Sequence, residues 1–330
     1  LCRVGLPSRN ELPRMFGLSY QKLCGTAHSA GSTIVIVRPK PTLFDILFAV
    51  RGSIAGRVAW RCLFITVLAC VVVFTGDFHL EPMSHLGTAP FGLIGIAISI
   101  FMSFRNSAAY DRWWEGRKQW GDLLVQVRSL ARELPDLDET SRKRVFISLI
   151  AYVNALAARL QGADETAAAR KWEVEAPEGP NTCDAILRGI GSELISLNKA
   201  GTLSDWRYAT LANRMNAIAS VQAACERIKS TPLPFAYTLL IHRSVYLFCV
   251  LLPFALAPQL GWGTPVIVAF ISYTFFGLDA IGDDLAEPFA PADNSLPLKA
   301  LVRTVERELM DFLGMKPLPD ELQPVGYVLS

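Results

Sequence analysis

The stretch from residue 91 to residue 120, FGLIGIAISIFMSFRNSAAYDRWWEGRKQW, decides the fold because it changes character halfway along. Residues 91–104 carry no charge, whereas charged residues and tryptophans become frequent from Arg105 onward. Neither proline nor glycine separates the two halves, so the pattern predicts one helix that runs through both. This helix is apolar for about four turns and is strongly charged after that.

The composition of the whole chain indicates a membrane protein. Of its 330 residues, 51% are apolar, and the mean hydropathy of +0.31 is higher than soluble domains usually show. The formal net charge of +2 decides nothing about nucleic acid on its own, and we expect no nucleic-acid partner. The seven cysteines show no C-x-x-C spacing, so we expect free thiols and neither a metal site nor a cofactor.

Four apolar runs are candidates for membrane spans, and they cover residues 58–75, 89–104, 234–257 and 264–281. Arg61 interrupts the first run, and His242 and Arg243 interrupt the third. Crossing about 30 Å of hydrocarbon takes about 20 apolar residues, and the uninterrupted cores are shorter than that. Buried helices of a soluble protein therefore remain the alternative interpretation.

The distribution of basic residues favours the membrane interpretation. The segments 76–89 and 258–263, which follow the first and third runs, contain no Lys or Arg. The opposite ends of the runs are flanked by Arg38, Lys40, Arg51, Arg57, Arg105, Arg112, Arg117, Lys118, Arg227 and Lys229. The positive-inside rule then predicts two hairpins with both termini in the cytoplasm, in the inner (plasma) membrane.

The predicted fold class is all-α, with four transmembrane helices as two hairpins plus a cytoplasmic helical bundle. We expect a disordered leader (1–37), a first hairpin (38–104), a cytoplasmic helical domain (105–233), a second hairpin (234–281) and a cytoplasmic C-terminal segment (282–330). Helical spacing breaks at Pro135, and Asp138 or Thr140 is suited to cap the next helix. Residues 162–181 indicate a loop, and further helices are expected over 183–198, 203–229 and 302–313.

Two neighbouring stripes run along the second apolar helix. Small residues at three- and four-residue spacing form one stripe, which permits close approach of another helix: Gly92, Gly95, Ser99 and Ser103. Ile96, Ile100 and Phe104 form the other. Such a bulky stripe either packs in the core of a bundle or, if several copies surround an axis, lines a hydrophobic constriction that gates ions by dewetting.

Acidic residues gather at the end of the fourth run, at positions Asp279, Asp283, Asp284, Glu287 and Asp293. Calcium would take six to eight oxygen ligands from such a cluster, but we favour ion pairs with Arg and Lys of the cytoplasmic helices. The sequence contains no Ser-His-Asp arrangement, glycine-rich phosphate loop or H-E-x-x-H pair, so we do not expect an enzyme.

Three separated blocks resemble the bestrophin channel family, in particular its bacterial branch: residues 95–121, 231–256 and 271–298. The resemblance covers about residues 38–318 and implies a homopentameric ion channel with one central pore. By motif, the family's hydrophobic neck falls on Ile96, Ile100 and Phe104, the stripe that spacing had already singled out. The cytoplasmic exit constriction falls on Trp206, next to Asp205, where the family usually has a branched aliphatic residue.

The sequence also departs from the family. Animal members hold calcium in a run of acidic residues, but EPFAPADN at 287–294 has Ala290, Pro291 and Ala292 where carboxylates are needed. Calcium activation through that clasp is not expected, and the Arg-Phe-Pro triplet of the animal branch is absent. An apolar neck does not distinguish the sign of an ion, so both chloride and sodium remain open.

We therefore expect a homopentameric channel that passes small monovalent inorganic ions across the lipid bilayer. A secondary transporter and a non-conducting membrane scaffold are the alternatives. A transporter would need broken helices near mid-membrane, and Pro253 and the break at His242 and Arg243 are the only hints of one.

Overall fold

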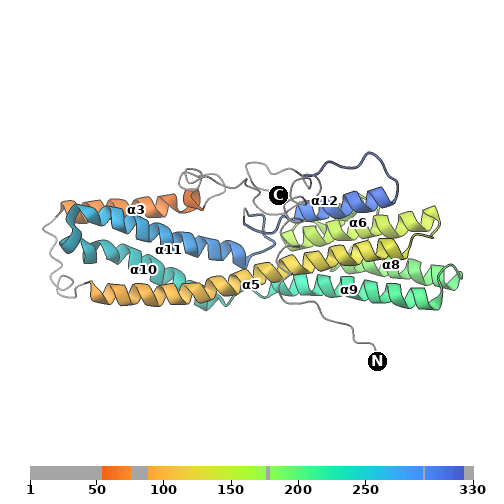
Figure 1. Ribbon diagram of the computed structural model, residues 1–330, viewed down its shortest axis with the longest axis horizontal. Coiled ribbons are helices and arrows are strands. Elements are labelled where there is room, and N and C mark those ends of the chain that lie inside the picture. Colours follow the sequence, from red (N-terminus) through yellow and green to blue (C-terminus); the bar gives the residue numbers. More distant parts are fainter. Residues whose placement is uncertain (1–53, 76–87, 176–178, 293, 323–330) are drawn as a thin grey trace, which may run out of the picture. The chain divides into compact units, whose positions relative to one another are not determined.

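The structure, a computed structural model, describes residues 54–75, 88–175, 179–292 and 294–322. All of them belong to one compact unit, Val35–Ser330. Within the described residues every regular element is a helix (Figure 1), so the all-α prediction is confirmed. The expected leader, residues 1–37, lies outside the described residues.

Four long helices correspond to the four apolar runs: α3 (Ala55–Phe74), α5 (Ala89–Glu133), α10 (Phe235–Leu260) and α11 (Thr264–Ala286). A 3₁₀ turn, η1 (Gly261–Gly263), joins α10 to α11. Figure 1 shows α3, α10 and α11 beside the first half of α5, and α11 contacts each of the other three helices. The predicted continuity of α5 is confirmed, because it runs for 45 residues without a break.

Three stretches of the described residues are long and apolar enough to cross a membrane. These are Ala55–Phe74, Ala89–Glu133 and Phe235–Ala286. The last stretch contains both α10 and α11. Pro253 and Pro258 lie inside α10 without ending it.

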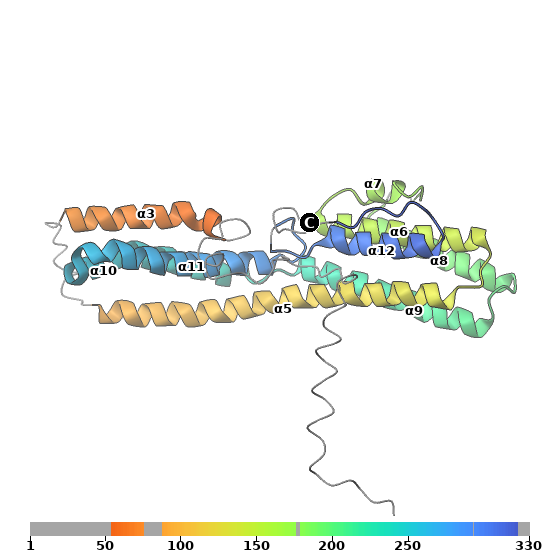
Figure 2. The same cartoon turned by 45° about the horizontal axis from the view of Figure 1, so that its top comes forward.

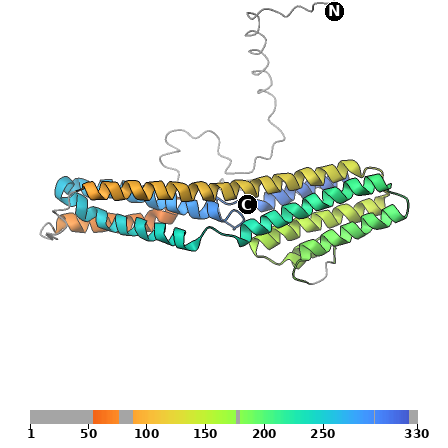
Figure 3. The same cartoon turned by 90° about the horizontal axis from the view of Figure 1, so that it is seen from below.

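The remaining helices form a bundle with the second half of α5, as Figures 2 and 3 show from two further sides. They are α6 (Glu139–Gln161), α7 (Glu165–Arg170), α8 (Thr182–Lys199), α9 (Asp205–Ser230) and α12 (Leu298–Phe312). Helix α9 packs on α5, while α6 packs against α7, α8 and α12. The core of this bundle is centred on α6, which buries residues from Val145 to Leu160.

The helix caps and helix ends in this bundle mostly agree with the sequence-based prediction. Asp138 caps α6 by accepting a hydrogen bond from the backbone N–H of Ser141, at 2.9 Å. Gly162 ends α6 with a φ of 73°, a left-handed conformation that glycine adopts without steric cost. The predicted loop over 162–181 is wrong in part, because it contains α7. Asp164 caps that short helix at Ala167, and the alanines that follow have high helix propensity.

Candidate functional site

One face of α5 is buried in the protomer and the opposite face is open. The buried residues recur every three to four positions and include Ile98, Met102, Arg105 and Ala109. The opposite face carries Ile96, Ile100 and Phe104, whose exposed fractions are 60%, 50% and 64%. The bulky stripe is therefore not part of the protomer's own core.

The neighbouring small stripe allows close packing at one of its positions. A Cβ atom built on Gly95 would lie 3.2 Å from the ring of Phe248 on α10, whereas one on Gly92 would meet nothing within 4 Å. Further along α5, towards its charged half, Ser99, Ser103 and Asn106 help to line an open pocket of about 440 Å³. Close approach through small residues is thus found at Gly95, against α10 of the same chain.

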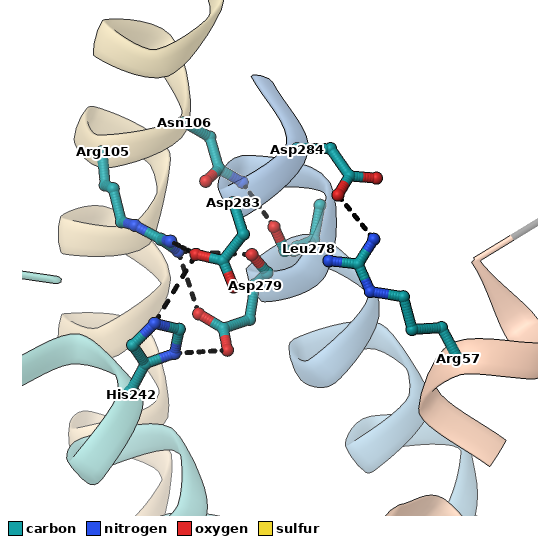
Figure 4. A network of polar contacts seen from close by, with 8 residues as sticks. All are labelled: Arg57, Arg105, Asn106, His242, Leu278, Asp279, Asp283 and Asp284. Carbon is teal, nitrogen blue, oxygen red and sulfur yellow. Dashed lines mark hydrogen bonds and ion pairs between the residues drawn. The ribbon is translucent and has the colours of Figure 1, made fainter. Parts of the chain in front are cut away.

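A buried ion-pair cluster joins α5, α10 and α11 where α5 turns from apolar to charged (Figure 4). Arg105 of α5 donates to Asp279 of α11 at 2.9 Å and also pairs with Asp283. His242 of α10 contacts the other oxygen of Asp279 at 2.7 Å. Arg105 is 1% exposed and Asp279 is fully buried. A buried carboxylate needs such partners, because an unpaired charge is costly there.

The predicted ion pairing of the acidic segment is confirmed for Asp279 and Asp283, which pair with Arg105. The partner of Asp284, however, comes from α3 and not from the helices that were expected to supply it. Arg57 of α3 also takes part, with a 2.5 Å pair to Asp284. The ligand atoms of His242, Asp279 and Asp283 lie within 4.8 Å of one another, a spacing compatible with a metal ion. The guanidinium of Arg105 already engages both carboxylates, however, so the arrangement fits ion pairing better.

Asn106, the residue after Arg105 on α5, adds a contact to α11 beside this cluster. Its amide donates to the carbonyl of Leu278 at 3.0 Å. A side chain at Gly282 would collide with Asn106, so the absence of a Cβ there permits the close approach of α5 and α11. Neither Asn106 nor Gly282 stands out in the sequence by spacing or charge.

Arg112, about two helical turns beyond Arg105 on α5, connects the two ends of the unit. Its Nε donates to the carbonyl of Ala286 at the end of α11, at 3.1 Å. Its Nη2 donates to the carbonyl of Ile228 at 2.6 Å, and its Nη1 donates to that of Thr231, both at the end of α9. One guanidinium thus satisfies terminal carbonyls of two helices, where a positive charge is favoured by the helix dipole.

The two exit residues lie at the far end of the bundle from the neck stripe. Trp206, in the first turn of α9, is 80% exposed. Asp205 precedes it and accepts a hydrogen bond from Asn198 at 3.0 Å. Arg207 donates to the carbonyl of Glu133, the last residue of α5, at 2.8 Å. The structure therefore does not bring these residues near Phe104, which lies roughly 40 Å away along α5.

The described cysteines are free thiols, as predicted. Cys183, Cys225 and Cys249 are buried. In the bundle formed by α6, α8 and α9, burial raises the pKa of Cys225 to about 12 and also raises that of Cys183. These thiols stay protonated at neutral pH and have little reactivity.

These features define an all-helical membrane protein whose longest helix leaves an apolar face uncovered. A family model described as "Bacterial/Fungal Bestrophin protein" matches residues 35–311. The chain therefore belongs to the bacterial and fungal bestrophin family, a family of ion channels and not of enzymes.

Curated relatives and solved structures agree with this assignment. Voltage-dependent anion channel-forming protein mll4386 of Mesorhizobium japonicum is 38% identical, over 86% of this chain and 94% of its own. Voltage-dependent anion channel-forming protein YneE of Escherichia coli is also 38% identical, over 88% of this chain and 98% of its own. The crystal structure of a bacterial bestrophin homolog from Klebsiella pneumoniae matches with a TM-score of 0.75 and 38% identity, covering 79% of this chain and all of that one.

Proposed function

We propose that the protein is a homopentameric channel that passes small monovalent ions through a central pore, with Ile96, Ile100 and Phe104 as its neck. The observation that carries this proposal is the exposure of all three side chains on the face of α5 that points away from the protomer's core. Large apolar side chains in such a position need a cover. A symmetric assembly of α5 helices around an axis provides one.

The neck would work as a hydrophobic constriction. Rings of isoleucine and phenylalanine offer no hydrogen bonds to water, so a narrow passage lined by them empties easily and gates ions by dewetting. Such rings do not distinguish the sign of an ion. The relatives named as anion channel-forming proteins favour chloride as the conducted ion.

In the proposed topology α3, the first half of α5, α10 and α11 cross the inner membrane. The segments 76–89 and 258–263, which lack Lys and Arg, lie outside, and both termini lie in the cytoplasm. The two hairpins then span residues 38–104 and 234–281, with residues 105–233 and 282–330 in the cytoplasm. The buried cluster around Arg105 lies at the cytoplasmic boundary.

The proposed exit of the pore is formed by Trp206, with Asp205 beside it. The high exposure of Trp206 supports this, because a large aromatic side chain that the protomer leaves uncovered is available to face an axis. Its size would narrow the exit more than a branched aliphatic residue does. Replacing Trp206 with Ala should then raise conductance if the exit limits the current.

Single-channel recording of the purified protein in planar bilayers with asymmetric NaCl tests the proposal, with native mass spectrometry of the same sample to count subunits. We expect discrete current steps from a pentamer. Saturating flux without steps would favour a transporter, and a stable assembly that passes no current would favour a scaffold. Either result would contradict the channel function.

A further inference from the structure

The open face of α5 does not end at the neck. Seven residues make close to two full turns of an α-helix, so positions seven apart share a face. Starting from Phe104, this spacing leads to Asp111, Lys118 and Val125, and all of them are exposed. Starting from Ile100, it leads to Ser107 and Trp114, which are also exposed. The neck stripe thus continues as a polar stripe below the apolar part of the helix.

Most other charges of α5 have a partner in the protomer, whereas the charges on this polar stripe have none among the described residues. Within the described residues, Arg117 and Asp122 of α5 also lack an ion pair. Arg105 and Arg112 are held by the contacts described above. Three further charged residues of α5 form ion pairs with other helices: Glu115 with Arg227, Arg128 with Glu308, and Glu133 with Arg214. By contrast, within the part of the chain that the structure describes, neither Asp111 nor Lys118 has an ion pair or a side-chain hydrogen bond.

We infer that Asp111 and Lys118 form two rings of opposite charge below the neck, and that these rings set the channel's preference between anions and cations. This inference rests on the proposed pentameric pore. Because the neck itself is apolar, discrimination by charge needs a second element. The exposed charged residues that the neck face presents after Phe104 are Asp111, then Lys118, then Asp122, which lies five helical turns beyond Phe104.

The distances along the helix make such an influence effective. At about 1.5 Å per residue, Asp111 lies roughly 10 Å beyond Phe104, and Lys118 roughly 10 Å beyond Asp111. The Debye length is about 10 Å in 0.1 M salt, so an ion that leaves the neck enters the field of the carboxylates before that of the ammonium groups. Rings of one sign raise the local concentration of the opposite ion. The carboxylates therefore oppose chloride and the ammonium groups favour it.

The test is the reversal potential of single channels in asymmetric NaCl near 0.1 M, for wild type, Asp111→Asn and Lys118→Gln. We expect Asp111→Asn to raise the chloride-to-sodium permeability ratio by about twofold to tenfold, and Lys118→Gln to lower it by a similar factor. Both shifts should shrink near 1 M salt, where the Debye length is about 3 Å. Asp320→Asn is the matched control, because this exposed carboxylate follows α12 and does not lie on α5. It should leave the ratio unchanged.

Other outcomes of these experiments would contradict either the charge rings or the proposed channel function. Currents with the same reversal potential in wild type and both α5 variants would overturn the charge rings while leaving the proposed channel intact. Loss of the pentamer in Asp111→Asn, seen by native mass spectrometry, would also overturn them, because the carboxylate would then be a contact between subunits. Absence of any unitary current from wild type would instead contradict the proposed function.

Discussion

Large apolar side chains are buried in the helical bundle but are largely exposed on the apolar helices at the other end of the unit. In the bundle around the second half of α5, helix α6 buries Phe146, Leu149 and Tyr152 completely. In α3, at the other end, Trp60 is 77% exposed and Leu63 is 53% exposed. The bundle therefore completes its own core, whereas the apolar helices leave much of their surface uncovered, as is typical of helices that lie in a membrane.

The helix starts differ in a similar way, except that α12 of the bundle has no side-chain cap. Each of the helices α6 to α9 begins with a capping side chain, from Asp138, Asp164, Asn181 and Ser204 in turn. The helices α3, α5, α10 and α11 have no side-chain cap. Caps stabilise helix ends that lie in water. The bundle is therefore stabilised by its own buried side chains and helix caps, whereas the four apolar helices depend on the membrane around them. The Arg105 cluster lies between these two regions.

The largest effect on this boundary is expected from Arg105→Gln. It leaves the buried Asp279 without its guanidinium partner, and breaking a buried pair in this way costs about 3–5 kcal/mol. Thermal unfolding in detergent measures the loss. Arg128→Gln is the matched control, because its partner Glu308 is exposed, and exposed pairs contribute about 0–1 kcal/mol. Equal losses in the two variants would show that the buried cluster contributes no more to stability than an exposed ion pair.

A second pair of variants compares the two ends directly. Leu149→Ala in α6 removes a fully buried side chain and should lower the free energy of unfolding by about 2–5 kcal/mol. Leu63→Ala in α3 removes an exposed one and should change it by less than about 0.5 kcal/mol. Denaturant titration in detergent measures both. A large loss in Leu63→Ala would mean that another subunit covers this part of α3.

The smallest effect concerns a single cap and depends on pH. Hydrogen bonds from Ser141 hold the pKa of Asp138 below its ordinary value of 3.8. A carboxyl group with a lowered pKa in the folded state stabilises fully above its unfolded pKa, and this contribution disappears as the pH falls through the folded pKa. Asp138→Ala should therefore lower the melting temperature at neutral pH, and the difference from wild type should vanish in strong acid.

Ser204→Ala provides the comparison for that experiment. Ser204 caps α9 through its hydroxyl, which does not titrate in this range. Its loss should lower the melting temperature by the same amount at every pH at which the bundle stays folded. A pH-dependent effect of Ser204→Ala, or a pH-independent effect of Asp138→Ala, would contradict the assignment of the Asp138 contribution to its charge.

Features that depend on neighbouring residues were predictable from the sequence. The continuity of α5, the cap at Asp138 and the alignment of Ile96, Ile100 and Phe104 on one face all follow from local spacing. The open side of α5 was not predictable, because spacing places residues on a common face without saying which face the protomer covers.

The contacts between distant segments were missed for a related reason. His242 lies 37 positions before Asp279, and Arg112 lies 116 positions before Ile228. Their pairing depends on how α9, α10 and α11 pack against α5. The sequence does carry a partial signal, since ionisable residues inside apolar runs usually have partners. It does not identify which partners they are.

The most direct test of the proposed pore compares two double variants of α5 that differ only in the face they alter. Ile96→Ala with Phe104→Ala changes the open stripe, whereas Ile94→Ala with Phe101→Ala removes the same residue types at similar exposures, 48% and 54%, on another face. Single-channel conductance in planar bilayers is the measurement. We predict that the first pair raises the conductance, because smaller side chains widen and wet the neck, and that the second pair leaves it unchanged. Equal conductance in both double variants would contradict the claim that the open face of α5 lines the pore.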